Sequence, residues 1–283
     1  MHKFFVSLFT LLICSSIIYA HEVPMVLVSI APYKLFVEKI AGDTVEVNLV
    51  VPAGASAHTY EPTPKQMIAA SQALAWFCIG ESFETRAIPS LKAYNPSMTL
   101  IDLRQGVDMI KADPLTGCCC CHANSQDLHI WLSARQMDIQ ARTIAQGLSQ
   151  LLPQNAEVYQ KGLDQLLQEL KALDQEITIS LKSLKNRLIV VSHPAYAYFC
   201  RDYDLKQMSI EFEGKDPTPL QLTNILNRAR AANTKKVYIQ KQYNNKGARL
   251  FAKELKAEVV MLDPYAEQYF DSMRAIAHQF STN

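Results

Sequence analysis

The sequence predicts an α/β protein with two lobes, each built on a mostly parallel sheet, and one long rigid helix that joins them. Short apolar runs rich in β-branched residues alternate with helix-like segments both before and after residues 154–185. Such alternation is typical of parallel sheets whose faces are covered by helices. With 283 residues, of which 49% are hydrophobic, the chain is long enough for two cores. We therefore expect a signal peptide at residues 1–20, a first lobe at 21–152, the linking helix at 153–185 and a second lobe at 186–283.

The amino terminus has the layout of a secretory signal. Lys3 precedes an apolar run at residues 4–18, and small Ala20 follows it before polar residues begin. The run is shorter than the roughly 20 residues that a membrane-spanning helix needs. We expect cleavage after Ala20 and a periplasmic mature protein. An uncleaved anchor is one alternative. A lipid anchor at Cys14 is another, although Ile13 is larger than the residue that usually precedes a lipidated cysteine.

The first lobe is expected to contain four strands. The second strand alternates, with Val45, Val47, Leu49 and Val51 on one face, before Pro52 ends it. The four expected strands are residues 26–30, 45–51, 73–79 and 98–103. Helices are expected at residues 33–41, which Gly42 ends, at residues 65–71, and directly after residues 127–132.

The linking helix is indicated by an apolar stripe in residues 154–185, which contain no proline and one glycine, Gly162. The stripe recurs every three or four residues, at Tyr159, Leu163, Leu166, Leu170, Leu173, Ile177, Leu181 and Leu184. At about 1.5 Å per residue the helix would span roughly 45 Å, more than one small lobe needs. The alternative is one arm of a helical hairpin or coiled coil, although nothing before or after residues 154–185 continues the stripe.

The second lobe follows the same plan without any evident sequence repeat. Its expected strands are residues 188–191, 206–210, 237–240 and 258–262. Its expected helices are residues 195–203, 219–232, 246–256 and 266–280. The two halves are therefore similar in architecture alone.

The charge balance excludes two classes of partner. The chain has 28 basic and 27 acidic side chains, and its pI is about 7.6. No basic patch with interleaved aromatic residues is present. Nothing in the sequence therefore favours binding to nucleic acid or to anionic membranes.

A block of consecutive cysteines is one candidate metal site. The block consists of Cys118, Cys119, Cys120 and Cys121, and His122 follows it. Neighbouring side chains diverge, so the four thiols cannot readily bind one tetrahedral ion, although Cys118 and Cys121 have a C-x-x-C separation. In an oxidising compartment the block is either an accessory loop that captures a soft metal or a disulfide-bearing or exposed loop. The disulfide pairing of these four cysteines, with one another or with Cys78 and Cys200, is left open by the sequence.

Three histidines and one aspartate lie where α/β proteins place their ligands. His58 is in the loop after the second strand, His193 follows residues 188–191, His129 stands before a predicted helix, and Asp263 closes the last strand. Ligands bind beyond the carboxyl ends of such strands. Three imidazoles and one carboxylate suit a divalent metal at about 2.0 to 2.2 Å. Because two of these residues precede the linking helix and two follow it, we expect the metal in the cleft between the lobes.

Four segments of the chain resemble a known family, the zinc and manganese solute-binding proteins of bacterial ABC importers. They are GASAHTYEPTP, DLHIWL, SHPAYAYF and LDP, in this order, and the resemblance covers essentially the whole mature chain. It implies that His58, His129, His193 and Asp263 are the four metal ligands. Ser56-Ala57 departs from the Asp-Pro that the family often has before the first histidine, which leaves the stiffness of that loop open.

The resemblance also implies a role and partners. A protein of this kind captures its ion and delivers it to a membrane permease that a cytoplasmic ATPase powers. We expect it to act as a monomer without enzymatic activity. Zinc-binding relatives often carry a loop rich in histidine and acids before the second ligand. The cysteine block stands at that place, which favours metal capture by residues 118–122.

Zinc is the ion that the predicted ligands favour. Three neutral imidazoles and one carboxylate suit Zn²⁺ better than Mn²⁺, which prefers oxygen ligands, and the resemblance implies that manganese-binding relatives have a glutamate at the position of His193. Mn²⁺ and Fe²⁺ remain the alternatives. Because only unprotonated imidazoles bind metal, we expect the affinity to fall below a pH of about 6.5.

An enzyme and an adhesin are the competing functions. Zinc on three histidines with an open position can activate water. Asp263 would close that position, and the sequence has no H-E-x-x-H motif, nucleophile elbow or Gly-rich phosphate loop. An adhesin would be an added role of the same metal-binding protein.

Overall fold

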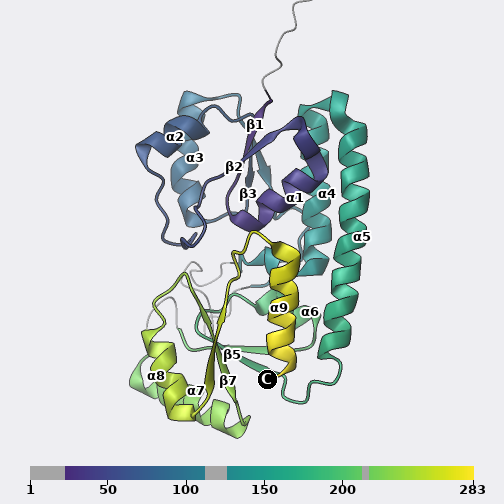
Figure 1. Ribbon diagram of the computed structural model, residues 1–283. Coiled ribbons are helices and arrows are strands. Elements are labelled where there is room, and N and C mark those ends of the chain that lie inside the picture. Colours follow the sequence, from purple (N-terminus) through teal and green to yellow (C-terminus); the bar gives the residue numbers. More distant parts are fainter. Residues whose placement is uncertain (1–22, 112–125, 212–216) are drawn as a thin grey trace, which may run out of the picture.

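The computed structural model describes residues 23–111, 126–211 and 217–283. In these ranges, two parallel four-stranded sheets form two lobes, and two long helices run beside them (Figure 1). The predicted signal peptide, the Cys14 alternative and the cysteine block with His122 lie outside the described residues. None of the helices in the described ranges combines the length and apolarity needed to cross a membrane.

The first sheet has the strand order β2-β1-β3-β4, with every neighbouring pair parallel. Its strands are β1 (Met25–Val28), β2 (Glu46–Leu49), β3 (Ala75–Cys78) and β4 (Thr99–Asp102). Its helices are α1 (Ala31–Ala41), α2 (Pro64–Ala70), α3 (Ser82–Tyr94) and α4 (Ala134–Leu151). The four predicted strands are confirmed, each somewhat shorter than expected.

Helix α3 (Ser82–Tyr94) was not predicted. It carries Pro89 in its interior and has no side-chain cap at its start, and both features weaken the signal of a helix. Its buried residues Phe83, Ala87 and Leu91 nevertheless recur every four positions. That spacing is the signal that identifies the helix in the sequence.

The second sheet has the same plan, with the order β6-β5-β7-β8 and parallel pairing throughout. Its strands are β5 (Leu188–Val191), β6 (Lys206–Ser209), β7 (Lys236–Gln240) and β8 (Glu258–Leu262). Its helices are α6 (Ala197–Asp202), α7 (Pro219–Ala231), α8 (Lys246–Leu255) and α9 (Tyr269–Ser281). All the predicted elements of this lobe are confirmed.

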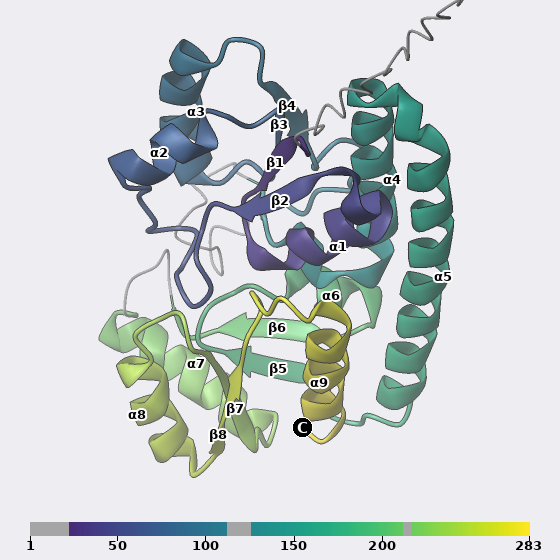
Figure 2. The same ribbon diagram turned by 45° about the horizontal axis from the view of Figure 1, so that its top comes forward.

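Helix α5 (Ala156–Leu181) joins the lobes, as predicted. Its 26 residues extend over about 39 Å, and Figures 1 and 2 show it beside α4 and along both lobes. The seven predicted stripe residues within α5 are all buried. The stripe packs against α1 and α4 of the first lobe and against α9 of the second.

One hydrophobic core runs through both lobes at this helix. Buried residues of α1, α5 and α9 belong to a single cluster, and the ring centroids of Phe36 and Tyr269 lie 4.8 Å apart. An ion pair of 3.3 Å between Lys34 of α1 and Glu267, two residues before α9, joins the lobes at the surface. This shared core favours small tilts of the lobes over a large hinge rotation.

Candidate metal centre

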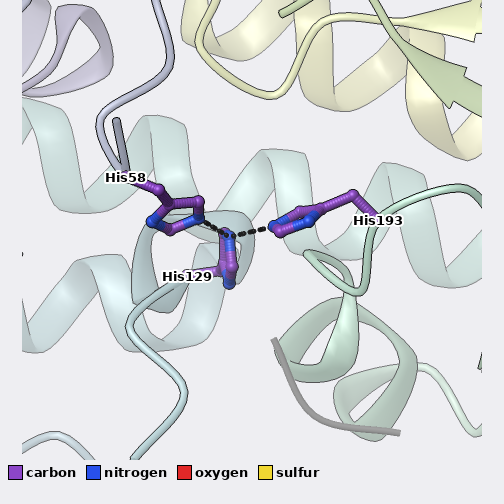
Figure 3. Close-up of side chains that lie close together, drawn as sticks. All are labelled: His58, His129 and His193. Carbon is purple, nitrogen blue, oxygen red and sulfur yellow. Dashed lines mark hydrogen bonds between the residues drawn. The ribbon is translucent and has the colours of Figure 1, made fainter. Parts of the chain in front are cut away.

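The three predicted histidines meet at the boundary between the lobes. His58 lies between β2 and α2, and His193 comes two residues after β5. His129 directly precedes a short 3-10 helix at Ile130–Leu132, which leads into α4. Figure 3 shows the three imidazole rings pointing toward one another. The structure therefore brings the three histidines together from both lobes, as the sequence predicts.

The histidine nitrogens form a compact group. Nε2 of His129 lies 3.3 Å from Nε2 of His58 and 3.4 Å from Nε2 of His193. One ligand atom from each of the three residues lies within 4.8 Å of the others. The three side chains are 3%, 1% and 1% exposed, so water reaches them poorly. Converging, buried imidazole nitrogens are the arrangement that a transition-metal ion needs.

A carboxylate holds each imidazole from behind, through the other ring nitrogen. The pairs at Nδ1 are Glu81 with His58 at 3.0 Å, Asp127 with His129 at 2.7 Å and Glu211 with His193 at 2.8 Å. A carboxylate at Nδ1 fixes the proton there, orients the ring, and leaves Nε2 as the metal-binding atom. These three carboxylates were not predicted as site residues. Their signal is the one used for the histidines, since Glu81 follows β3 and Glu211 follows β6.

Burial and neighbouring charge shift the pKa values of two of the histidines in opposite directions. Burial alone would lower the pKa of His58, but the charge and hydrogen bond of Glu81 raise that pKa above its usual value. Burial lowers the pKa of His193 well below its usual value, and the electrostatic effect of the neighbouring imidazoles of His58 and His129 lowers it further. His193 is therefore neutral and can bind metal near pH 7. His58 keeps its proton to a higher pH than a free imidazole does, so the metal competes with that proton up to a higher pH.

Replacing Glu81 with glutamine should move the pH dependence of zinc affinity. Without the carboxylate, burial dominates and the pKa of His58 falls, so the loss of affinity on acidification should begin at lower pH. The affinity at pH 8 should also fall by about tenfold or more, because the imidazole loses the partner that orients it. Chelator competition at a series of pH values measures both effects. Glu61→Gln is the matched control, since Glu61 is 81% exposed in the same segment as His58. An unchanged pH midpoint in Glu81→Gln would contradict this role.

Aromatic side chains frame the histidines and connect the lobes. Tyr243, in the loop after β7, stacks on His193 with ring centroids 4.4 Å apart and an angle of 17°. The hydroxyl of Ser56, in the first lobe, donates to Oη of Tyr243 at 3.3 Å. Trp131 lies 5.3 Å from His129 between ring centroids, and its Nε1 donates to the carbonyl of Pro264 at 2.8 Å. Both aromatic residues therefore link a histidine to the opposite lobe.

Asp263 does not belong to the three-histidine group. Within the described ranges, the group of converging ligand atoms contains His58, His129 and His193. The carboxylate of Asp263 instead pairs with Nζ of Lys241 and accepts hydrogen bonds from Gln242 and from the backbone nitrogen of Tyr265. Its role as a fourth ligand stays a prediction.

The two described cysteines are structural. Cys78, at the end of β3, and Cys200, in α6, are free thiols with buried side chains. Burial raises the pKa of both thiols. A buried thiol with a raised pKa is a poor metal ligand and a poor nucleophile.

A known protein family matches the chain over most of its length. Residues 26–283 match the family described as zinc-uptake complex component A, periplasmic. The chain belongs to this family. The match runs from the second residue of β1 through the rest of both lobes, and the similarity to zinc and manganese solute-binding proteins that the sequence motifs predict is thereby confirmed.

Individual known proteins are similar to this one over most of the chain. A Chlamydia muridarum protein named for metal binding is 35% identical over 97% of this chain and 98% of its own. The manganese ABC transporter substrate-binding lipoprotein PsaA of Streptococcus mitis is 26% identical over 83% of this chain and 76% of its own. The structure of a zinc-bound ZnuA deletion mutant superposes with a TM-score of 0.86 and 37% identity, covering 92% of this chain and 97% of that one.

Proposed function

We propose that this protein captures zinc outside the cytoplasm and delivers it to an ABC permease. The observation that carries the proposal is the group of three buried imidazoles, His58, His129 and His193, whose Nε2 atoms converge from two lobes. Each ring is oriented by its own carboxylate. A binding protein needs such a preformed site because it must take up an ion at low concentration.

The donor set supports zinc as the ion. Zn²⁺ accepts imidazole nitrogen readily and prefers four ligands, so three histidines provide most of its shell. Mn²⁺ and Fe²⁺ require more oxygen ligands and larger coordination numbers, which makes them the second choice. Relatives named for zinc and for manganese both occur. Asp263 is the proposed fourth ligand.

Membership in the family supports the partners and the location. The matched family is described as a periplasmic component of a zinc-uptake complex. We propose that its partners are a membrane permease and the cytoplasmic ATPase that powers it. The Streptococcus mitis relative is named a lipoprotein, and for this chain we propose a cleaved signal peptide with lipidation at Cys14 as the alternative. We propose that the protein acts as a monomer, which is sufficient because one chain supplies all three histidines.

Binding fits the site better than hydrolysis does. A hydrolytic zinc centre needs a general base beside the metal-bound water. The three carboxylates nearest the imidazoles are each paired with a histidine Nδ1 behind the ring. In that position a carboxylate orients a ligand and does not face the ion. We therefore propose a protein without catalytic activity.

Elemental analysis of the purified protein tests the proposal. The wild-type protein, stripped of metal and exposed to equal concentrations of Zn²⁺, Mn²⁺ and Fe²⁺ without oxygen, should retain a stoichiometric amount of zinc after gel filtration. His193→Ala should retain much less. His278→Ala is the control, because His278 is exposed on α9. Retention of manganese or iron in preference to zinc would change the proposed cargo. Absence of any retained metal would contradict the function itself.

A further inference from the structure

A buried carboxyl group holds the turn that contacts His58. Glu84, in the first turn of α3, is 1% exposed. Its Oε1 accepts from the backbone nitrogen of Ile79 at 3.0 Å and from the hydroxyl of Ser29. Its Oε2 accepts from the backbone nitrogen of Gly80 at 2.6 Å. Glu84 therefore binds two successive N–H groups of the chain directly after β3.

The same turn contacts His58 twice. Oε2 of Glu81 pairs with Nδ1 of the ring at 3.0 Å, and the hydroxyl of Ser82 donates to the carbonyl oxygen of His58 at 3.4 Å. Neither contact involves Nε2, the atom that converges with His129, so an ion bound there leaves both contacts in place. Because Glu81 and Ser82 directly follow Gly80, the position of the turn determines where both contacts are made.

The turn has a backbone conformation that needs support. Gly80 has a φ of 89°, in the left-handed region that favours glycine, and a side chain there would come within 2.4 Å of Nη1 of Arg104. Burial raises the pKa of Glu84 to about 7, and its hydrogen bonds act in the opposite direction. A buried carboxyl group is unfavourable unless such bonds are made. The hydrogen bonds to the turn therefore account for an acid at this buried position.

We propose that Glu84 is a positioning residue of the metal site, which fixes the turn at residues 79–82 and thereby the orientation of His58. The proposal rests on the proposed function, because it concerns the same site. Glutamine at this position would place an NH₂ group where one oxygen now accepts from a donor. One buried donor would then lose its partner, and the turn would shift.

A mutant cycle in the whole protein tests the proposal. Glu84→Gln is made in the wild type and in a background with Glu81→Ala and Ser82→Ala, which lacks both contacts to His58. Chelator competition measures zinc affinity, and thermal unfolding measures stability. In the wild type, Glu84→Gln should weaken zinc binding by about fivefold, less than the tenfold or more that follows the loss of a direct partner. In the background it should leave zinc affinity unchanged, whereas the melting temperature should fall in both proteins.

Asn95→Ala is the matched control for a general loss of stability. Asn95 lies at the other end of α3, where its side-chain amide donates to the carbonyl oxygens of Ser71 and Ala73 at 2.9 Å each. Its replacement should lower the melting temperature and leave zinc affinity unchanged. Ser29→Ala removes one of the donors to Glu84 and is the milder variant, for use where Glu84→Gln does not fold. It should show the same dependence on the background with a smaller loss.

Two results would overturn the proposal. One is an equal loss of zinc affinity from Glu84→Gln in both backgrounds, because Glu84 would then act on the stability of the lobe and not through the contacts to His58. The other is a folded Glu84→Gln protein with the zinc affinity of the wild type. Failure of the wild-type protein to bind zinc at all would instead remove the proposed function.

Discussion

Replacing His129 with alanine should reduce zinc affinity on the order of a hundred- to a thousandfold. Its Nε2 is the atom that lies within 3.4 Å of both other imidazoles, so its loss removes the central ligand of the group. The estimate follows from dividing the binding free energy of a typical zinc site among its ligands. Competition against a chelator of known affinity measures the change.

The control for this variant is His278→Ala, which removes an exposed imidazole elsewhere in the chain. Circular dichroism and thermal unfolding of His129→Ala would show whether the buried site still folds. A folded His129→Ala protein that binds zinc as tightly as the wild type would contradict a site built on the three histidines. In that case the tight site would have to lie elsewhere.

Gly162→Ala should destabilise the protein by about 2 kcal/mol, the typical cost of overpacking. A methyl group at Gly162 would come within 2.6 Å of the carbonyl oxygen of Ile40 and 2.7 Å of that of Lys39. Both contacts are with the backbone of α1, which cannot rotate away. The clash should exceed the gain of about 1 kcal/mol that alanine brings inside a helix. The melting temperature should fall by about 2 to 4 °C for each kcal/mol lost.

Gly147→Ala in α4 is the matched control. The added methyl group would also come within 2.6 Å of another atom, but that atom is Cδ1 of Ile101, the end of a flexible side chain. Its rotation should keep the stability within about 1 kcal/mol of the wild type. Equal melting temperatures for the two variants would show that α5 does not approach the α1 backbone as closely as the structure has it.

The architecture could be predicted because its signals are local. The β-branched runs and the stripe from Tyr159 to Leu181 depend on spacing within a short window, and the structure confirms both. Helix α3 was missed because Pro89 interrupts a segment that tertiary packing stabilises. The exact limits of the lobes, at residues 152 and 186, stay a prediction.

The candidate site was predictable only in part. His58, His129 and His193 were found from their positions at strand and helix ends, and the structure brings them together. The carboxylates behind them were missed, because a contact such as that between Glu211 and His193 joins residues 18 positions apart that follow two different strands. The engagement of Asp263 by Lys241 is likewise a tertiary contact across 22 positions, which no local pattern reveals.

A crystal structure of the zinc-loaded protein, with anomalous scattering data collected on both sides of the zinc edge, tests the central claim most directly. We predict one strong zinc peak among Nε2 of His58, His129 and His193, at about 2.0 to 2.1 Å from each nitrogen. A fully occupied zinc peak at the block of residues 118–122, with none among the three histidines, would contradict the account.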